Sequence, residues 1–504
     1  TAPCLAGLFC ESVSCRLTSL DKPLQMLQFN GASGRLFAFA ATKYAPILVA
    51  CAQLERFEMT RRDLFMPSLQ KRLSAKSAQG GVATLLVVMV LLFVVSMVAA
   101  YTGRNILFEQ RISTNLFQAT VSSEAAEAGM DWALGLLNGS LIDDNCQPIE
   151  DLSAITPISS RSFRDRYVSI DSASGAISVP VAVRNGPQWP SCVLYPDGTW
   201  RCSCPSAGGP ALTAPAGSAL APAFRVRFVQ IREPIPLNPG LVRIEVNGCT
   251  ALDNACLDFK PADPASCRGS VCSTLALTGG LKSLPTAAVT ARGTFDLGTS
   301  VATIANGGVG SSGLLIVAGG AVNQASLNLQ SVPGMPIANA VVSFDSGLSA
   351  AAFTGDRMFA ALFGIWPNTF ADQPSVVRLN CAGGCGAGTV RNALKLNPGR
   401  PLLVQGSLAL DGGVAIGSST NPVLIVATGN IGFTAATDVY GLVYSRAASW
   451  STSGNGRIIG AAVGESNIAG TSTFTVAYDA RVLDALRWTT GSFVRVPGSW
   501  ADFQ

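Results

Sequence analysis

Apolar residues are concentrated in one unbroken stretch near the start of the chain, from Val82 to Tyr101. The stretch VATLLVVMVLLFVVSMVAAY carries no charged side chain, and its polar side chains are those of Thr84, Ser96 and the terminal Tyr101. A helix needs roughly 20 residues to cross a hydrocarbon layer of about 30 Å, and this stretch has that length. The pattern therefore predicts a transmembrane helix, with a buried core helix as the alternative.

Basic residues before the stretch predict which way it crosses the membrane. Lys71, Arg72 and Lys76 precede it, and Lys and Arg are enriched on the cytoplasmic side of membrane helices. We therefore expect a single pass, with the N-terminal side in the cytoplasm and the large C-terminal part exported.

The helical pattern continues beyond the membrane stretch. Apolar residues recur there at spacings of three and four, interrupted by Ser123: Phe108, Ile112, Leu116, Ala119, Ala126, Met130, Ala133 and Leu137. This spacing predicts one amphipathic continuation of the helix, which docks the exported part through this stripe. Asn138-Gly139 provides a left-handed stop signal. A continuous helix from Val82 to Leu137 is about 84 Å long at 1.5 Å per residue.

A leader-like motif precedes the helix, and a second motif lies within it. Gln79-Gly80-Gly81 is followed by Val82-Ala83-Thr84-Leu85-Leu86, and the later segment contains Glu109, Arg111, Asn115 and the Ala-Ala-Glu-Ala run from Ala125 to Ala128. Together they resemble the prepilin signal and the helix of PilX-type minor pilins of type IV pili. The segments MFAALFGIWP, IGSSTNPVLIVATGNI, DVYGLVYS and GRIIGAAVG resemble the C-terminal parts of PilX-like pilus assembly proteins.

The resemblance implies cleavage by a prepilin peptidase after the last leader glycine. The alignment favours the bond between Gly81 and Val82, with Gly80 to Gly81 as the runner-up. Glycine lacks a Cβ atom and so lets another backbone approach closely. A merely flexible break before the helix is the alternative interpretation of these glycines.

One position departs from the pattern of the major pilins. These carry a glutamate five residues into the mature chain, where it neutralises the terminal ammonium of a neighbouring subunit. Here that position is Leu86, or Leu85 if the count starts at Gly81. Because a buried ammonium without its carboxylate is costly, the chain suits a tip or priming position better than the repeating body of a filament.

The region before the leader fits this organisation poorly. Residues 1–65 begin at Thr1, contain four cysteines (Cys4, Cys10, Cys15 and Cys51) and show no sustained period. A start at Met66, or less favourably Met59, gives the short basic leader 66–81 that the family uses. We expect residues 1–65 to be upstream sequence from a misplaced start, with a real cytoplasmic extension as the alternative.

The remaining cysteines all lie beyond the helix. They are ten in number: Cys146, Cys192, Cys202, Cys204, Cys249, Cys256, Cys267, Cys272, Cys381 and Cys385. An even number in an oxidising compartment predicts up to five disulfides, whose connectivity stays open. Zinc is the rival, but the spacings form no pair of CxxC knuckles and the chain has no histidine.

The part of the chain that we expect to be exported has two regions of different composition. Residues 139–280 hold eight of these cysteines, and Arg225, Arg227 and Gln230 alternate with apolar residues as in half-buried strands. Residues 281–487 are rich in glycine, and Gly417, Gly441 and Gly460 end comparable apolar runs. This texture predicts a β-solenoid, with a β-sandwich as the alternative. The fold class expected is α+β: the helix 82–138, a disulfide-stapled β-rich region, the solenoid-like domain and a C-terminal tail, 488–504.

Composition excludes several functions. Charged residues make up 13% of the chain and nearly cancel to a net +4, so there is no footprint for a nucleic acid. The absence of histidine removes His-based triads and His-ligated metals. Acidic residues between 297 and 426 are separated by long neutral stretches (Asp345, Asp356, Asp372 and Asp411), and no pair is placed for acid–base catalysis. Asp143-Asp144, Asp253 and Asp258 favour solvated loops over calcium sites. We expect no enzyme, no cofactor and no metal.

These observations, with the resemblance, predict a minor pilin that primes or caps a type IV pilus. Its helix, including Leu86, then packs against the helices of other subunits. The resemblance implies these partners: other minor pilins and the major pilin, the prepilin peptidase, the inner-membrane platform, a tip adhesin and membrane lipid. It also implies the inner membrane of a Gram-negative bacterium, followed by the pilus tip. The alternatives are a minor pseudopilin of a type II secretion system and a membrane-anchored β-helical carbohydrate-active enzyme.

Overall fold

The computed structural model describes residues 81–502 with eight internal gaps: 157–160, 181–187, 206–210, 218–219, 232–238, 263–265, 309 and 434–435. The predicted extension 1–65 and the predicted leader up to Gly80 lie outside the described residues. The chain divides into two units, Thr1–Ala99 and Ala100–Gln504.

One long helix, α2 (Gly81–Leu137), begins in the first unit and ends in the second; it has 57 residues. It contains no proline, so nothing in its covalent structure interrupts the ladder of backbone hydrogen bonds. Within the described part of the chain it is the one helix that is long and apolar enough to cross a membrane, and none of its most apolar window is buried. It ends at Leu137, where the apolar spacing predicts its end.

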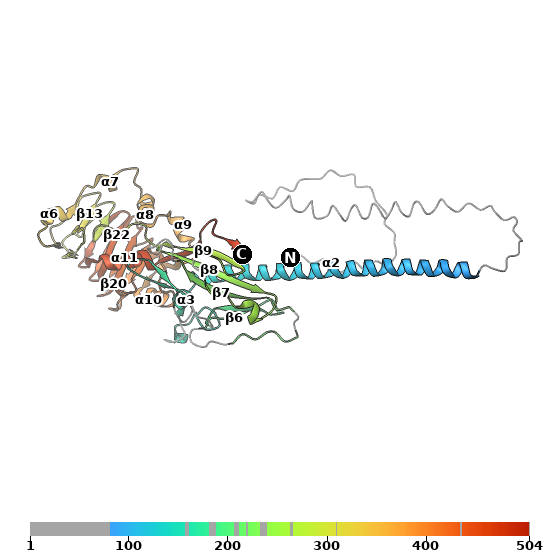
Figure 1. The fold of residues 1–504 in the computed structure, drawn as a ribbon. Helices are drawn as coiled ribbons and strands as arrows, with labels where there is room; N and C mark the ends of the chain where they lie inside the picture. The colour runs from blue at the N-terminus through green and yellow to red at the C-terminus, as the bar shows by residue number, and fades with distance from the viewer. Residues whose placement is uncertain are drawn as a thin grey trace, which may run out of the picture. The chain divides into compact units, whose positions relative to one another are not determined.

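An antiparallel sheet follows in the second unit, with the strand order β25-β9-β8-β7-β5-β6 and with β26 beside β9. Figure 1 shows its central strands beside the C-terminal end of α2. The strands are β5 (Ser191–Leu194), β6 (Trp200–Ser203), β7 (Ala223–Gln230), β8 (Leu241–Cys249), β9 (Val271–Gly279), β25 (Gly491–Arg495) and β26 (Ala501–Asp502). Residues 488–504, predicted as a tail, therefore contribute two strands. The segment is short, and its pairing partner lies more than 200 residues away, so the local pattern does not reveal it.

The alternation in the sequence predicts that β7 is half-buried, but charged side chains of β7 and β8 are buried as well. Arg227 of β7 is only 3% exposed and Glu245 of β8 is 0% exposed, and the two form an ion pair. The guanidinium of Arg227 also lies 4.4 Å from the ring centre of Phe259. Because both charges are paired, the face can be covered by the segment after β8, which alternation in a single strand does not predict.

Five disulfides join the ten cysteines that follow the helix. The pairs are Cys146–Cys204, Cys192–Cys202, Cys249–Cys256, Cys267–Cys272 and Cys381–Cys385. The first of them closes the longest loop, with a sequence separation of 58 residues. Because all ten of these cysteines are oxidised to disulfides, none of them offers a thiolate ligand to zinc.

A sheet of 12 described strands lies between the two ends of the antiparallel sheet in the sequence, and its pairs are parallel. Its strands are β10 (Val289–Ala291), β12 (Thr303–Asn306), β13 (Ile316–Ala318), β14 (Asn328–Ser331), β15 (Val341–Val342), β16 (Val377–Gly386), β17 (Leu402–Leu410), β18 (Val423–Ala427), β19 (Ile431–Phe433), β20 (Asp438–Ser445), β22 (Arg457–Gly464) and β24 (Thr475–Tyr478). A smaller parallel sheet contains β11 (Phe295–Asp296), β21 (Ser449–Gly454) and β23 (Asn467–Ser472). A β-sandwich would pair its strands antiparallel, so the observed pairing disfavours that alternative.

Two paired glycines allow the neighbouring strands β20 and β22 of the parallel sheet to approach each other closely. Gly441 of β20 pairs with Gly460 of β22, and both have positive φ, 146° and 138°. A Cβ atom at Gly460 would lie 2.1 Å from the carbonyl oxygen of Gly441. Two of the recurring glycines in the sequence therefore mark paired strands, whereas Gly417 lies in a bend outside that ladder.

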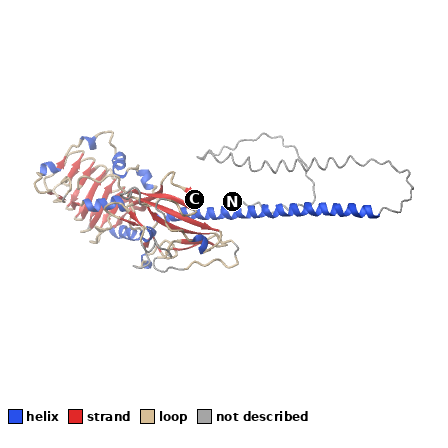
Figure 2. Ribbon diagram, viewed as in Figure 1, coloured by secondary structure: helices blue, strands red, loops and turns tan. Residues whose placement is uncertain are grey.

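Short helices lie along the sides of the strands (Figure 2). Phe359 and Phe363 of α8 and Phe370 of α9 pack with Leu442 and Tyr444 of β20 in one buried cluster. The helices are α3 (Phe163–Tyr167), α5 (Asn254–Leu257), α6 (Ile337–Ala340), α7 (Ser346–Ser349), α8 (Gly355–Phe363), α9 (Pro367–Ala371), α10 (Ala387–Leu396) and α11 (Ala480–Thr489), with a 3-10 turn, η1 (Leu152–Ala154). Two strand pairs complete the described elements: β1 (Leu141–Ile142) with β2 (Arg161–Ser162), and β3 (Ser169–Ile170) with β4 (Ile177–Ser178).

Candidate functional site

The N-terminal part of α2 presents a long run of exposed apolar side chains. Leu86 is 63% exposed, Phe108 66% and Leu116 67%. Other large apolar residues from Leu85 to Phe117 are exposed as well, Ile112 among them. A soluble monomer rarely exposes a contiguous apolar surface of this extent, so the surface is suited to contact with lipid or with other protein.

This exposure corrects one prediction about the helix. The prediction that Phe108, Ile112 and Leu116 dock the exported domain is wrong, because all three are exposed, while Met130 and Leu137 are buried as predicted. Apolar spacing shows that a helix has an apolar face, but it does not identify what covers that face.

The C-terminal part of α2 is docked on the antiparallel sheet. Ala126, Met130, Ala133 and Leu137 are buried in one cluster with the apolar residues of β7, β8 and β9. The shared partners on the sheet include Phe224, Val226, Phe228, Ile244, Val246 and Leu275. The small alanines bring the helix axis close to the sheet, so these residues anchor the helix to its domain.

Two glycines make this close approach possible. A Cβ atom on Gly129 of α2 would lie 2.7 Å from the ring of Phe224. A Cβ atom on Gly248 of β8 would lie 2.0 Å from the carbonyl oxygen of Ser122 and 2.6 Å from the amide nitrogen of Ala126. The contact at Gly248 is with helix backbone, which cannot rotate away as a side chain can.

The end of α2 is tied to β25. The side-chain amide of Asn138 donates to the carbonyl oxygen of Phe493 at 2.9 Å and accepts from its backbone N–H at 2.7 Å. Arg495 pairs with Asp131 at 2.5 Å. Neither Asn138 nor Gly139 has a positive φ, so the predicted left-handed stop is wrong. The helix ends at Leu137 without a left-handed residue, and the amide of Asn138 is used for a tertiary contact with β25.

The carboxylates considered for calcium are used within the chain. Asp144 pairs with Arg166 at 2.6 Å, and Asp258 pairs with Arg225. The Asp253 side chain accepts from the backbone N–H of Ala255 at 3.0 Å and caps α5. Within the described residues, no group of three His, Cys, Asp or Glu side chains is placed to hold a metal ion.

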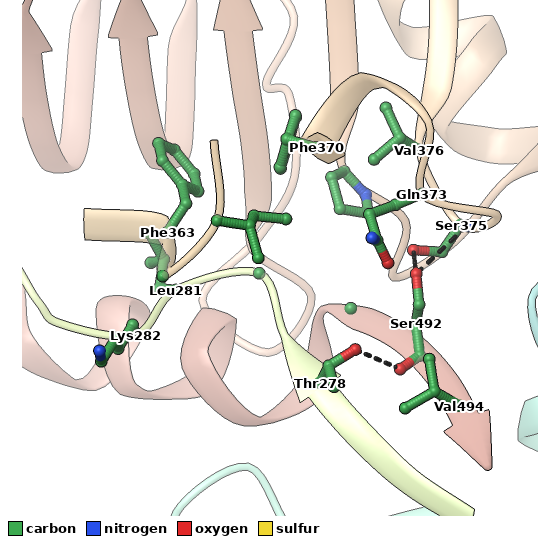
Figure 3. A pocket seen from close by; sticks show the side chains of 15 residues that line it. Thr278, Leu281, Lys282, Phe363, Phe370, Gln373, Ser375, Val376, Ser492 and Val494 are labelled. Carbon is green, nitrogen blue, oxygen red and sulfur yellow. Dashed lines mark hydrogen bonds between the residues drawn. The ribbon is translucent and has the colours of Figure 1, made fainter. Parts of the chain in front are cut away.

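A cavity of about 400 Å³ lies between β9 and β25 on one side and α8 and α9 on the other. Phe363, Phe370 and Val376 form part of its apolar wall (Figure 3). The buried hydroxyl groups of Ser375 and Ser492 lie 2.7 Å apart at another wall. Lys282 is the titratable side chain among the described residues that line the cavity, and Figure 3 shows it on the side away from the two serines. The lining therefore lacks a hydroxyl paired with a base.

The predicted cleavage site lies at the start of the described chain. Gly81 is the first residue of α2 and Val82 the second. The runner-up bond involves Gly80, which lies outside the described residues.

Comparison with known proteins gives little support for any one family. No model of a known protein family matches the chain, and no curated protein matches it. Among solved structures, the competence-associated pilin ComZ from Thermus thermophilus is similar at 8% sequence identity, over 76% of this chain and 97% of that chain, with a TM-score of 0.18. A TM-score this low does not establish a shared fold.

Proposed function

We propose that the chain is a membrane-inserted, pilin-like subunit that assembles through its N-terminal helix. The observation that carries this proposal is the contrast along α2. Large apolar side chains are exposed from Leu85 to Phe117, and the helix is buried on its own sheet from Ala125 onward. The exposed part is long enough to cross a bilayer and can later pack against similar helices.

The role within the filament is that of a minor pilin that primes or caps assembly. Leu86, or Leu85 in the other register, occupies the position where the resemblance to pilins places a glutamate in the repeating subunits. A subunit without this carboxylate leaves a neighbouring ammonium unpaired in an apolar filament core. The cost is avoided where the subunit lies at the filament end.

We further propose that the parallel strands form a β-solenoid, and that this solenoid is the exposed end of the subunit. Support comes from the register, in which Asp438 pairs with Arg457 and Arg457 pairs with Thr475. From β16 to β24, each neighbouring strand is supplied by the next turn of the chain about 20 residues later, as in solenoid folds. The earlier strands β10 and β12 join this stack from far away in the sequence, where they pair with β22 and β24. The role that we propose for it is structural, without catalysis.

Replacing Gly81 by valine tests the proposal at the processing step. We expect the Gly81→Val protein to keep its leader, because a β-branched side chain blocks close approach of the protease to the backbone. The measurement is N-terminal sequencing of the protein purified from membranes. The wild type should begin at Val82.

The matched control is Gly103→Val in the same helix. A Cβ atom on Gly103 meets nothing within 4 Å, so this variant should be processed like the wild type. A wild-type protein that keeps its original amino end, or normal processing of Gly81→Val, contradicts the proposal.

A further inference from the structure

A second cavity lies beside α10, in a part of the fold that the proposed assembly role does not use. Its volume is about 680 Å³. Three of the residues that line it are cationic, Arg391, Lys395 and Arg400, and one is acidic, Asp165. The lining therefore carries an excess of positive charge.

Arg391 is the one of these cations that has a buried N–H group without a hydrogen-bond partner. Its Nη1 atom is buried and has no hydrogen-bond partner. Within the described residues, neither Arg391 nor Lys395 belongs to an ion pair. A buried guanidinium N–H without an acceptor is costly, and such groups are normally paired with protein, water or ligand.

Arg400 adds positive charge without an acidic partner. It donates through Nε to the carbonyl oxygen of Ser375 at 2.9 Å and through Nη2 to that of Pro374 at 3.2 Å, and through Nη1 to the side chain of Asn397. All three acceptors are neutral. Burial lowers the pKa of Arg400.

A further buried arginine precedes the lining residue Asp165 in the chain. Arg164 donates to the carbonyl oxygens of Thr489 and Gly491 at 3.1 and 2.8 Å. Burial lowers the pKa of Arg164 to about 10; Asp165 opposes this shift and Arg400 adds to it. Asp165 itself also accepts a hydrogen bond from Ser162, at 2.7 Å. Because the lining holds three cations and one carboxylate, its net charge favours an anion in the cavity.

We propose that this cavity binds a small anionic ligand that carries a carboxylate, sulfate or phosphate group. The guanidinium of Arg391, which has no ion-pair partner among the described residues, pairs with the oxyanion, and Lys395 supplies a second positive charge. Leu394, Val414 and Val423 offer apolar contact to an organic body attached to the anion. The described lining contains no aromatic side chain on which a neutral sugar ring could stack.

Isothermal titration of the full chain in detergent tests this site. The probes are sulfate, phosphate and D-glucuronate, each at ionic strength held constant with sodium chloride. We expect saturable binding to the wild type that is at least about tenfold weaker in Arg391→Gln, because one charge-assisted hydrogen bond is lost. Tighter binding of D-glucuronate identifies an organic acid as the ligand, and tighter binding of sulfate or phosphate an inorganic oxyanion.

Two further variants keep the test decisive. Lys395→Gln changes an exposed side chain, so it should weaken binding without altering the melting temperature, even if Arg391→Gln folds poorly. Arg378→Gln is the matched control, because Arg378 is an exposed arginine that pairs with Asp372 elsewhere on the chain; its binding should equal that of the wild type. Absence of saturable binding of all three probes, or undiminished binding in Lys395→Gln, overturns the proposal.

Discussion

Replacing Gly248 by alanine should loosen α2 from its sheet and lower the free energy of unfolding by about 3–5 kcal/mol. The added Cβ atom would lie 2.0 Å from the carbonyl oxygen of Ser122, so the helix backbone must move away from β8. That movement opens the cluster that contains Ala126 and Met130. Denaturant unfolding monitored by tryptophan fluorescence measures the loss, because the ring centre of Trp132 lies 5.3 Å from that of Phe224 at this contact.

The same helix offers a control for this prediction. A Cβ atom on Gly135 meets nothing within 4 Å, and alanine has the higher helix propensity. Gly135→Ala should therefore raise the free energy of unfolding by about 0.5–1 kcal/mol. If Gly248→Ala is as stable as Gly135→Ala, α2 is not docked on β8 as described.

Replacing Phe108 and Leu116 by aspartate should prevent incorporation into filaments while leaving the folded domain intact. Both side chains are exposed, so the substitutions cost the subunit's own fold little. In an assembled bundle each carboxylate would be buried against apolar helices, at about 2–4 kcal/mol per group. We expect incorporation, measured by immunoblot of sheared filaments against the membrane fraction, to fall at least about tenfold.

Gln118→Asp is the matched control for assembly. Gln118 is also exposed on α2, but it is polar, so a carboxylate there adds charge without replacing an apolar contact. This variant should be incorporated like the wild type. Equal incorporation of the Phe108→Asp, Leu116→Asp double variant would show that this part of the helix does not contact other subunits.

The features that sequence predicts best here are those set by local chemistry. The apolar run and its continuing period predict α2 and its end at Leu137, because a helix is determined by neighbours three and four residues apart. The cysteine count predicts up to five disulfides, but only the fold brings Cys146 within reach of Cys204 across 58 residues.

The features that sequence does not predict depend on distant partners. Phe108 and Met130 share one apolar stripe, yet only Met130 meets the sheet. The strand Gly491–Arg495 pairs with β9 far away in the sequence. Arg391 and Arg400 line one cavity with Asp165 only after the chain has folded, so no local motif marks them as a site.

Site-specific photo-cross-linking from α2 tests the central claim most directly. A photoreactive amino acid at Leu92, an exposed position in the apolar run, is introduced into the full chain, and sheared filaments are irradiated. If α2 packs among the helices of other subunits, the processed protein appears in the filaments as covalent adducts with pilin. If the filaments contain none of the protein, and the membrane fraction yields adducts with lipid alone, the helix is only an anchor and the assembly role is wrong.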